Sequence, residues 1–341
     1  MGRQFCTPLK TLYADLCYVA LMIARKFAAL ALLAALIAAS FVFFNHTLIA
    51  QTSPGADSSI TDTDVPMNKT LAYHLSTNAV GRARGFEGNL DDMFEVSGWR
   101  YSIYSGTNLA FLTNAVWSTN FWLKGVLGLS ATSIGYSNGM GGQGMVTMVS
   151  PRHYLCATHM HPEGFLAAFL GSNNIIYWRK TLQRVDVTND ISVGILNADL
   201  PPSVGYMPVL PPDYTNYISA KNATFVQGIG MNQGLRVFGQ PMQLVNRTVV
   251  YWNCERRSPF GLGTNWNVAI HGGDSSNPEM LLIGNQLVLV SHNYSVNSGP
   301  NYAFQIDAIN RQMHHLSTDN HLKTDYQLTL YSLTNWPVIN R

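Results

Sequence analysis

The chain has 341 residues, of which 47% are hydrophobic and only 12% are charged, and its formal net charge is +2. This composition is too apolar for a disordered protein, since disordered segments are poor in hydrophobic residues and rich in net charge. No cluster of lysine and arginine alternates with aromatic residues, so the charge pattern predicts no nucleic-acid partner.

The first predicted element is an apolar segment at residues 27–44. Its 18 residues carry no charge and, as a helix, are just long enough to cross about 30 Å of hydrocarbon. Arg25 and Lys26 directly precede it, which predicts that residues 1–26 stay in the cytoplasm and that the rest is exported. Two interpretations stay open. A signal anchor would hold the protein in the membrane by this single helix, whereas a cleaved signal peptide would release it outside the cytoplasm.

Residues 45–90 are expected to form a flexible linker, because they are rich in Ser, Thr, Asp, Gly and Pro and show no apolar period. From residue 91 the pattern changes to short apolar or alternating runs separated by Gly, Pro, Asn and Asp, which is typical of a β-sandwich or β-barrel. The one helical pattern lies at Ile306–Leu316. We therefore expect an all-β domain over 91–318 with a C-terminal helix, followed by an extension over 319–341.

Cysteines are few. Cys6 and Cys17 precede the apolar segment, and Cys156 and Cys254 fall in the exported part. These two form either one disulfide or two buried thiols, and the sequence predicts no disulfide framework.

A first candidate nucleophile is Ser137, in the Gly-Tyr-Ser-Asn-Gly motif at residues 135–139. The motif fits the Gly-x-Ser-x-Gly pattern of hydrolases with a nucleophile elbow, which requires a helix directly after the serine. Here a glycine-rich run and another predicted strand follow. We interpret the motif as a hairpin loop.

A second candidate site consists of His159, His161 and Glu163. It resembles the start of the His-x-His-x-Asp-His motif of metallo-β-lactamase-like hydrolases, but Gly164 stands where the last histidine is needed. Zinc requires three or four converging ligands. A metal-dependent hydrolase is therefore the less favoured alternative, and we predict neither a metal nor another cofactor.

A third candidate uses the whole domain. A serine becomes nucleophilic when an imidazole takes its proton and an acid holds that imidazole. The run Cys-Ala-Thr-His-Met at 156–160 resembles the Thr-Ala-Ala-His-Cys motif of trypsin-like serine proteases. Thr-Asn-Asp-Ile at 188–191 resembles their Asn-Asp-Ile strand, and Gly-Asp-Ser-Ser-Asn-Pro at 273–278 resembles their Gly-Asp-Ser-Gly-Gly-Pro. Two further motifs, at 226–232 and 287–293, follow the family's order.

This resemblance, which covers about residues 140–318, implies a divergent, bacterial member of the family. It implies two six-stranded antiparallel Greek-key barrels and hydrolysis of peptide bonds in proteins or peptides through an acyl-enzyme. His159 is implied as the general base, Asp190 as the acid behind it and Ser275 as the nucleophile. The N–H groups of Gly273 and Ser275 are implied as the oxyanion hole.

The chain departs from the family directly after the nucleophile. Ser276 and Asn277 replace two glycines, at a place where glycine tolerates unusual backbone angles. A second interpretation therefore stays open, namely a weak or inactive protease fold that serves as a binding module. The family's activation signal is also absent before His159, so Asp274 is expected to find either another partner or solvent in place of a new N-terminus.

The resemblance also implies a substrate pocket. Ala269 is implied at its floor, and its wall is implied to come from Ser291, His292 and Asn293. Since an uncharged floor offers no partner for a buried cation, we expect a neutral rather than a basic side chain before the scissile bond, and His292 leaves room for an acidic one.

Overall fold

The computed structural model describes eleven stretches of the chain: 66–83, 94–95, 115–119, 121–136, 145–218, 225–231, 237–245, 248–251, 270, 272–295 and 297–339. All of them fall in the unit formed by residues 63–341. The predicted membrane or signal segment at 27–44 lies outside the described residues. Within the described stretches, no helix is both long and apolar enough to cross a membrane.

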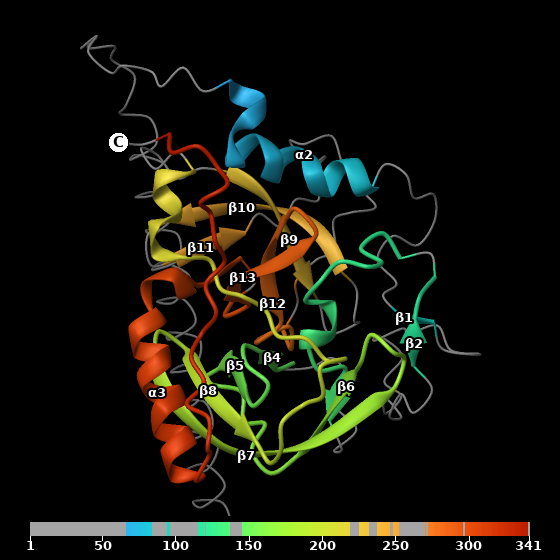
Figure 1. Cartoon of the computed structure of the whole chain (residues 1–341), viewed down its shortest axis with the longest axis vertical. Helices are drawn as coiled ribbons and strands as arrows, with labels where there is room; N and C mark the ends of the chain where they lie inside the picture. The colour runs from blue at the N-terminus through green and yellow to red at the C-terminus, as the bar shows by residue number, and fades with distance from the viewer. Residues whose placement is uncertain are drawn as a thin grey trace, which may run out of the picture. The chain divides into compact units, whose positions relative to one another are not determined.

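Two antiparallel sheets of six strands each make up most of the fold, and both are curled (Figure 1). The first sheet consists, in spatial order, of β3 (Gly135–Tyr136), β6 (Leu166–Leu170), β7 (Ile176–Thr188), β8 (Ile191–Leu196), β5 (His153–Ala157) and β4 (Thr147–Met148). The second consists of β13 (Gln286–His292), β12 (Pro278–Ile283), β9 (Phe225–Met231), β10 (Val237–Val245), β11 (Thr248–Tyr251) and β14 (Ser298–Pro300). The prediction of a mostly β domain is confirmed.

The two sheets share one strand order. If the strands of each sheet are numbered 1 to 6 along the chain, both sheets follow the ring 1-2-3-6-5-4, opened at different places. The first ring is opened between β3 and β4, where Thr132 and Thr147 form an isolated antiparallel bridge. The second is opened between β13 and β14, where Ser295 bridges Ser298. In each sheet, an isolated bridge thus lies beside the two edge strands.

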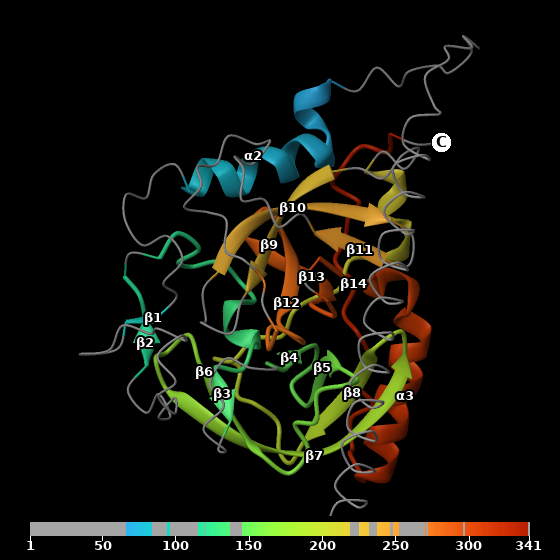
Figure 2. The same cartoon turned by 180° about the vertical axis from the view of Figure 1, so that it is seen from behind.

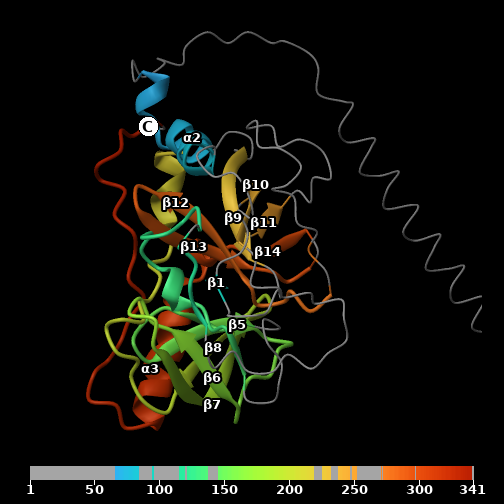
Figure 3. The ribbon, with the colours of Figure 1, turned by 90° about the vertical axis from the view of Figure 1, so that its right-hand side faces the viewer.

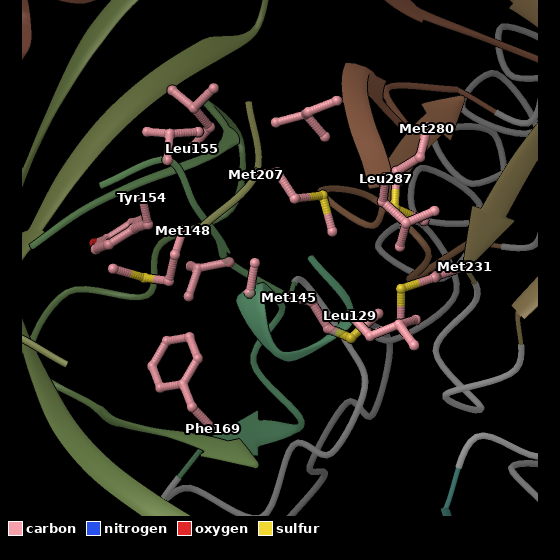
Figure 4. Close-up of a cluster of buried hydrophobic side chains, with 14 of the residues drawn as sticks. Leu129, Met145, Met148, Tyr154, Leu155, Phe169, Met207, Met231, Met280 and Leu287 are labelled. Atoms are coloured by element: carbon pink, nitrogen blue, oxygen red, sulfur yellow. The ribbon is translucent and has the colours of Figure 1, made fainter. Parts of the chain in front are cut away.

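One hydrophobic core extends from the first sheet to the second (Figure 4). It combines side chains of β4, β5 and β6 with side chains of β9, β12 and β13. Loop residues fill the space between the two groups. The labelled members are Met148, Tyr154, Leu155 and Phe169 from the first sheet, Met231, Met280 and Leu287 from the second, and Leu129, Met145 and Met207 between them. Methionine suits such a junction because its unbranched side chain adapts to irregular gaps.

Helix α2 (Leu71–Ala83) packs on the second sheet, against β9 and β12 (Figure 3). The hydroxyl of Thr70 accepts a hydrogen bond from the N–H of Tyr73 at 3.2 Å and so caps the helix start. Leu71 and Leu75 are buried in a second hydrophobic cluster, inside the second sheet. Residues 71–83 are thus a packed helix, although they belong to the stretch expected to be a flexible linker.

Helix α3 (Ile306–Asp319) packs on β7 and β8 of the first sheet (Figure 2). It includes the predicted helical stretch, and Ile309, Met313 and Leu316 form its buried face. In the extension after it, Leu330 makes a single parallel bridge to Val209.

The remaining described elements are short. They are η1 (Met67–Lys69), β1 (Phe94–Glu95), β2 (Val116–Trp117), η3 (Leu129–Ala131), η4 (Pro212–Asn216) and η6 (Tyr302–Phe304).

Candidate active site

A two-residue hairpin turn between β7 and β8 positions Asp190. Asn189 and Asp190 have φ angles of +50° and +65°, and a type I′ turn requires such positive values at both central residues. Asn and Asp are the non-glycine residues that tolerate this conformation best. The turn meets the end of β5, where the N–H of Thr158 donates to the Asp190 carbonyl oxygen at 2.9 Å. The sequence Asn-Asp therefore places the acid beside His159.

The imidazole of His159 is paired with the Asp190 carboxylate. Its Nδ1 lies 2.9 Å from Oδ1 and 3.0 Å from Oδ2, and the His159 backbone N–H also donates to Oδ1 at 3.2 Å. Because a carboxylate only accepts hydrogen bonds, Nδ1 carries the proton and Nε2 keeps the lone pair. A general base needs this tautomer.

Asp190 is held in its charged form. Burial raises the pKa of this carboxyl, but interactions with His292 and His159 lower it more, so that the net pKa lies below its ordinary value. The acid is therefore ionised at neutral pH and stabilises positive charge on the imidazole beside it.

Hydrogen bonds hold the loop of Ser275 against the segment that carries His159. The hydroxyl of Ser276 accepts from the N–H of Ala157 at 2.6 Å, two residues before His159. The N–H of Ser276 donates to the carbonyl oxygen of Asn293, at the end of β13, at 3.0 Å. Ser275 thus lies next to the residue that joins the loop to the base-bearing segment. The candidate nucleophile and the candidate base belong to one region of the fold.

Ser275 is half-buried, whereas Ser276 is fully buried. Among the described residues, no hydrogen bond connects the Ser275 hydroxyl with His159. In hydrolases without substrate this bond is often long and shortens only in the complex. The role of Ser275 therefore stays a prediction.

The loop contains two residues with left-handed backbone. Gly273 has φ +103°, which glycine adopts freely, and Ser276 has φ +71°, which is strained for a residue with a Cβ. The unusual angle expected after the nucleophile occurs at Ser276. The hydrogen bond between its hydroxyl and Ala157 offsets part of this strain.

Asp274 is fully buried, with 1% of its surface exposed. The Nδ2 of Asn277 donates to its Oδ1 at 3.4 Å, and the N–H of Asn277 donates to its carbonyl oxygen at 3.1 Å. Asn277, which replaces a glycine of the resembled family, is thus a partner of this buried acid.

The residues predicted to line the pocket wall are all buried. Ser291, His292 and Asn293 expose no more than 1% of their surface, and Ala269 lies outside the described residues. His292 faces inward, with its Nε2 3.6 Å from Asp190 Oδ2 and its Nδ1 hydrogen-bonded to the hydroxyl of Tyr302. No motif in the sequence indicated this contact with the acid.

A partly exposed aromatic ring lies beside the candidate base. The ring centroids of Tyr294 and His159 are 6.1 Å apart, and the ring planes are inclined by 68° in an edge-to-face arrangement. Tyr294 is 55% exposed, and 44% of the His159 side chain is accessible. Both side chains can therefore be reached from solvent.

The residues proposed as metal ligands have other partners. Nδ1 of His161 lies 3.0 Å from a guanidinium nitrogen of Arg184, and Glu163 forms an ion pair with the same guanidinium. The Arg184 side chain is only 8% exposed, so its positive charge is poorly screened and opposes a cation at this place. Among the described residues, no group of three or more His, Cys, Asp or Glu side chains is arranged to hold a metal ion.

Of three further residues singled out in the sequence, the structure describes only Cys156. Ser137 and Cys254 lie outside the described residues, so the hairpin-loop interpretation of Ser137 stays a prediction. Cys156 is buried as a free thiol, and burial raises its pKa. A thiol with a raised pKa is a poor nucleophile.

No family model matches the chain, and no curated protein shows a significant match to it. The function is therefore inferred from the geometry of the site and from the sequence motifs that led to it.

Proposed function

We propose that the protein is an endopeptidase of the trypsin-like serine type, with His159, Asp190 and Ser275 as its catalytic triad. One observation carries the proposal: the bonded His159–Asp190 pair adjoins a loop that is hydrogen-bonded to the same segment and contains Ser275. The two curled six-stranded antiparallel sheets with one shared strand order also support it, because they are compatible with the two barrels that the resemblance implies.

In this mechanism the Ser275 oxygen attacks the carbonyl carbon of a peptide bond while His159 Nε2 takes the serine proton. The charged Asp190 stabilises the imidazolium. The N–H groups of Gly273 and Ser275 donate to the oxyanion of the tetrahedral intermediate. His159 then gives the proton to the leaving amine as the C–N bond breaks, and water hydrolyses the acyl-enzyme by the reverse sequence.

The proposed substrates are proteins or peptides. The exposed ring of Tyr294 beside His159 supports a surface site that is open to an extended chain. The preference for a neutral side chain depends on Ala269. Cleavage of a peptide library mainly after Arg or Lys would contradict it.

The proposed location is outside the cytoplasm, either tethered by the segment at 27–44 or released after its cleavage. The uncharged run and the preceding Arg25 and Lys26 support export. N-terminal sequencing of the mature protein distinguishes the two forms, and a protein found wholly in the cytoplasm would contradict both.

Replacing single serines tests the proposal. Ser275→Ala is expected to reduce peptide hydrolysis by a factor of about 10⁴ or more, because it removes the nucleophile. Ser203→Ala is the matched control, since it also removes a serine hydroxyl, one whose hydrogen-bond partner is Tyr177 and not a residue of the candidate site. It is expected to keep nearly the wild-type activity.

Other outcomes would favour the other candidate functions. If Ser137→Ala abolished activity while Ser275→Ala kept it, the triad would be wrong. Activity lost with a chelator and restored with zinc would favour a metal-dependent hydrolase. A folded wild-type protein without any hydrolysis would favour the binding module.

A further inference from the structure

A row of four polar side chains leads inward from the candidate base. His159 pairs with Asp190, whose Oδ2 faces Nε2 of His292 at 3.6 Å, and Nδ1 of His292 is hydrogen-bonded to the hydroxyl of Tyr302. The accessible fraction of the side chains falls from 44% at His159 to 11% at Asp190 and 2% at His292. Tyr302 is also buried. The acid is thus approached by one histidine from the surface and by another from the interior.

The charges along this row follow from burial. Burial lowers the pKa of His292 more than Asp190 raises it, and the charge of His159 adds to the lowering, so the ring is neutral near pH 7. Burial raises the pKa of Tyr302 well above its ordinary value, so its hydroxyl keeps its proton. Two groups contact the His292 ring, the charged Asp190 carboxylate and the Tyr302 phenol, and His159 acts on it through its charge.

These charges fix the tautomer of His292. A neutral imidazole has one N–H and one lone pair. If the lone pair were on Nε2, it would point at the charged oxygen of Asp190 and be repelled. Nε2 therefore carries the proton, and Nδ1 accepts the hydrogen bond from Tyr302.

We propose that His292 and Tyr302 are positioning residues for Asp190: the Tyr302 hydroxyl holds the His292 ring so that its Nε2–H faces the carboxylate, which fixes the orientation of the carboxylate toward His159. This inference rests on the proposed protease function and extends it. It also gives His292 a role different from the pocket wall that the sequence implied.

The second buried histidine offers a contrast. His153 in β5 lies between two hydroxyl groups, with Nδ1 3.1 Å from Ser150 Oγ and Nε2 3.3 Å from Ser317 Oγ. Neither partner is an acid of the candidate site. His153 is therefore a matched control for the loss of a buried, hydrogen-bonded histidine.

The test measures how fast a fluorophosphonate labels Ser275 between pH 5 and pH 9. Tyr302→Phe keeps the aromatic ring and removes the hydroxyl, so the His292 ring loses the hydrogen bond that holds it toward Asp190. We expect labelling at pH 7 to slow at least tenfold. The acid limb of the pH–rate profile should move to higher pH, because an Asp190 without its N–H partner holds the His159 proton more strongly.

Two substitutions at His292 separate positioning from packing. His292→Leu should show the same slower labelling and the same shift as Tyr302→Phe. His292→Gln keeps an N–H that can face Asp190, and should recover at least part of the rate and the original profile. His153→Gln should lower stability and leave the pH profile of labelling unchanged.

The outcomes distinguish this inference from the function on which it rests. If the folded wild-type protein is not labelled at Ser275, both fail. If it is labelled, and Tyr302→Phe and His292→Leu keep the wild-type rate and profile, the positioning role fails and the triad stands. A shift in His153→Gln equal to that in His292→Leu would also overturn the positioning role, because it would show a general effect of destabilisation.

Discussion

The two sheets follow the same strand order and contribute different parts of the candidate site. The first sheet carries the base and the acid, and His159 and Asp190 touch each other directly at the end of β5 and the β7–β8 turn. The second sheet carries the nucleophile loop, whose contact with the first runs through Ser276 and Ala157. The base–acid pair is thus set by local turn chemistry, whereas the position of Ser275 depends on how the two sheets pack.

Each sheet also contains one fully buried histidine. His153 of the first sheet is satisfied by the hydroxyls of Ser150 and Ser317, and it links β5 to α3. His292 of the second sheet lies between an acid and a phenol. Burial alone therefore does not distinguish the two histidines. The difference lies in the groups that each ring contacts, and only His292 contacts a residue of the candidate site.

The largest effect is expected from a substitution that removes the contact between base and acid. Asp190→Asn should lower peptide hydrolysis by a factor of about 10⁴, because an amide can stabilise the wrong His159 tautomer and gives no negative charge. The double variant with Ser275→Ala should be hardly less active than Ser275→Ala alone, since the triad acts as a unit. Initial rates on one peptide substrate measure both. Losses that simply multiply would show that the two sheets do not contribute to one site.

The next effect concerns the buried histidine of the first sheet. Burial and the nearby Arg152 lower the pKa of His153 to about 4 from an ordinary value of 6.5. Between pH 4 and pH 6.5, His153 is therefore protonated in the unfolded chain but not in the folded protein. The contribution of His153 to stability is therefore complete above pH 6.5 and declines toward pH 4, by about 3 kcal/mol.

Urea unfolding at several pH values measures this loss. His153→Gln should be less stable than wild type at pH 7 and should lose less stability on acidification. If the two proteins showed parallel stability curves between pH 7 and pH 4, His153 would not be the group that responds.

The smallest effect compares one glycine in each sheet. A Cβ on Gly194 would lie 2.0–2.3 Å from atoms of the Tyr154 ring, and a Cβ on Gly228 would lie 2.2–2.4 Å from the side chain of Met242. A rigid ring in the core can move aside for the added Cβ less easily than a flexible thioether side chain can. Gly194→Ala should therefore lower the free energy of unfolding by about 2 kcal/mol and Gly228→Ala by about 1 kcal/mol. Equal losses in denaturant unfolding would contradict this difference in packing.

The fold was predictable where a pattern is local. Short apolar runs indicated the strands, and the spacing of Ile309, Met313 and Leu316 indicated α3, which the structure has at Ile306–Asp319. Helix α2 was missed because Leu71 and Leu75 stand among polar residues and are buried only against the distant second sheet. The predicted export helix at 27–44 stays a prediction.

The candidate site was likewise predictable where it depends on local sequence. Two adjacent residues, Asn189 and Asp190, determine the tight turn that carries the acid, and the motif around His159 indicated the base that pairs with it. The contact of His292 with Asp190 joins two segments far apart in the chain, whereas Tyr302 follows His292 by 10 residues. It depends on where β13 ends in the sheet, so no motif could indicate it.

The most direct test of the triad is the site of covalent labelling in the wild-type protein. After treatment with a fluorophosphonate at pH 8, peptide mapping by mass spectrometry should find one adduct, on Ser275, and denatured protein should carry none. Asp190→Asn should show the same adduct formed far more slowly. An adduct on Ser276 or Ser137, or a folded and unlabelled wild-type protein, would contradict the assignment of Ser275 as the nucleophile.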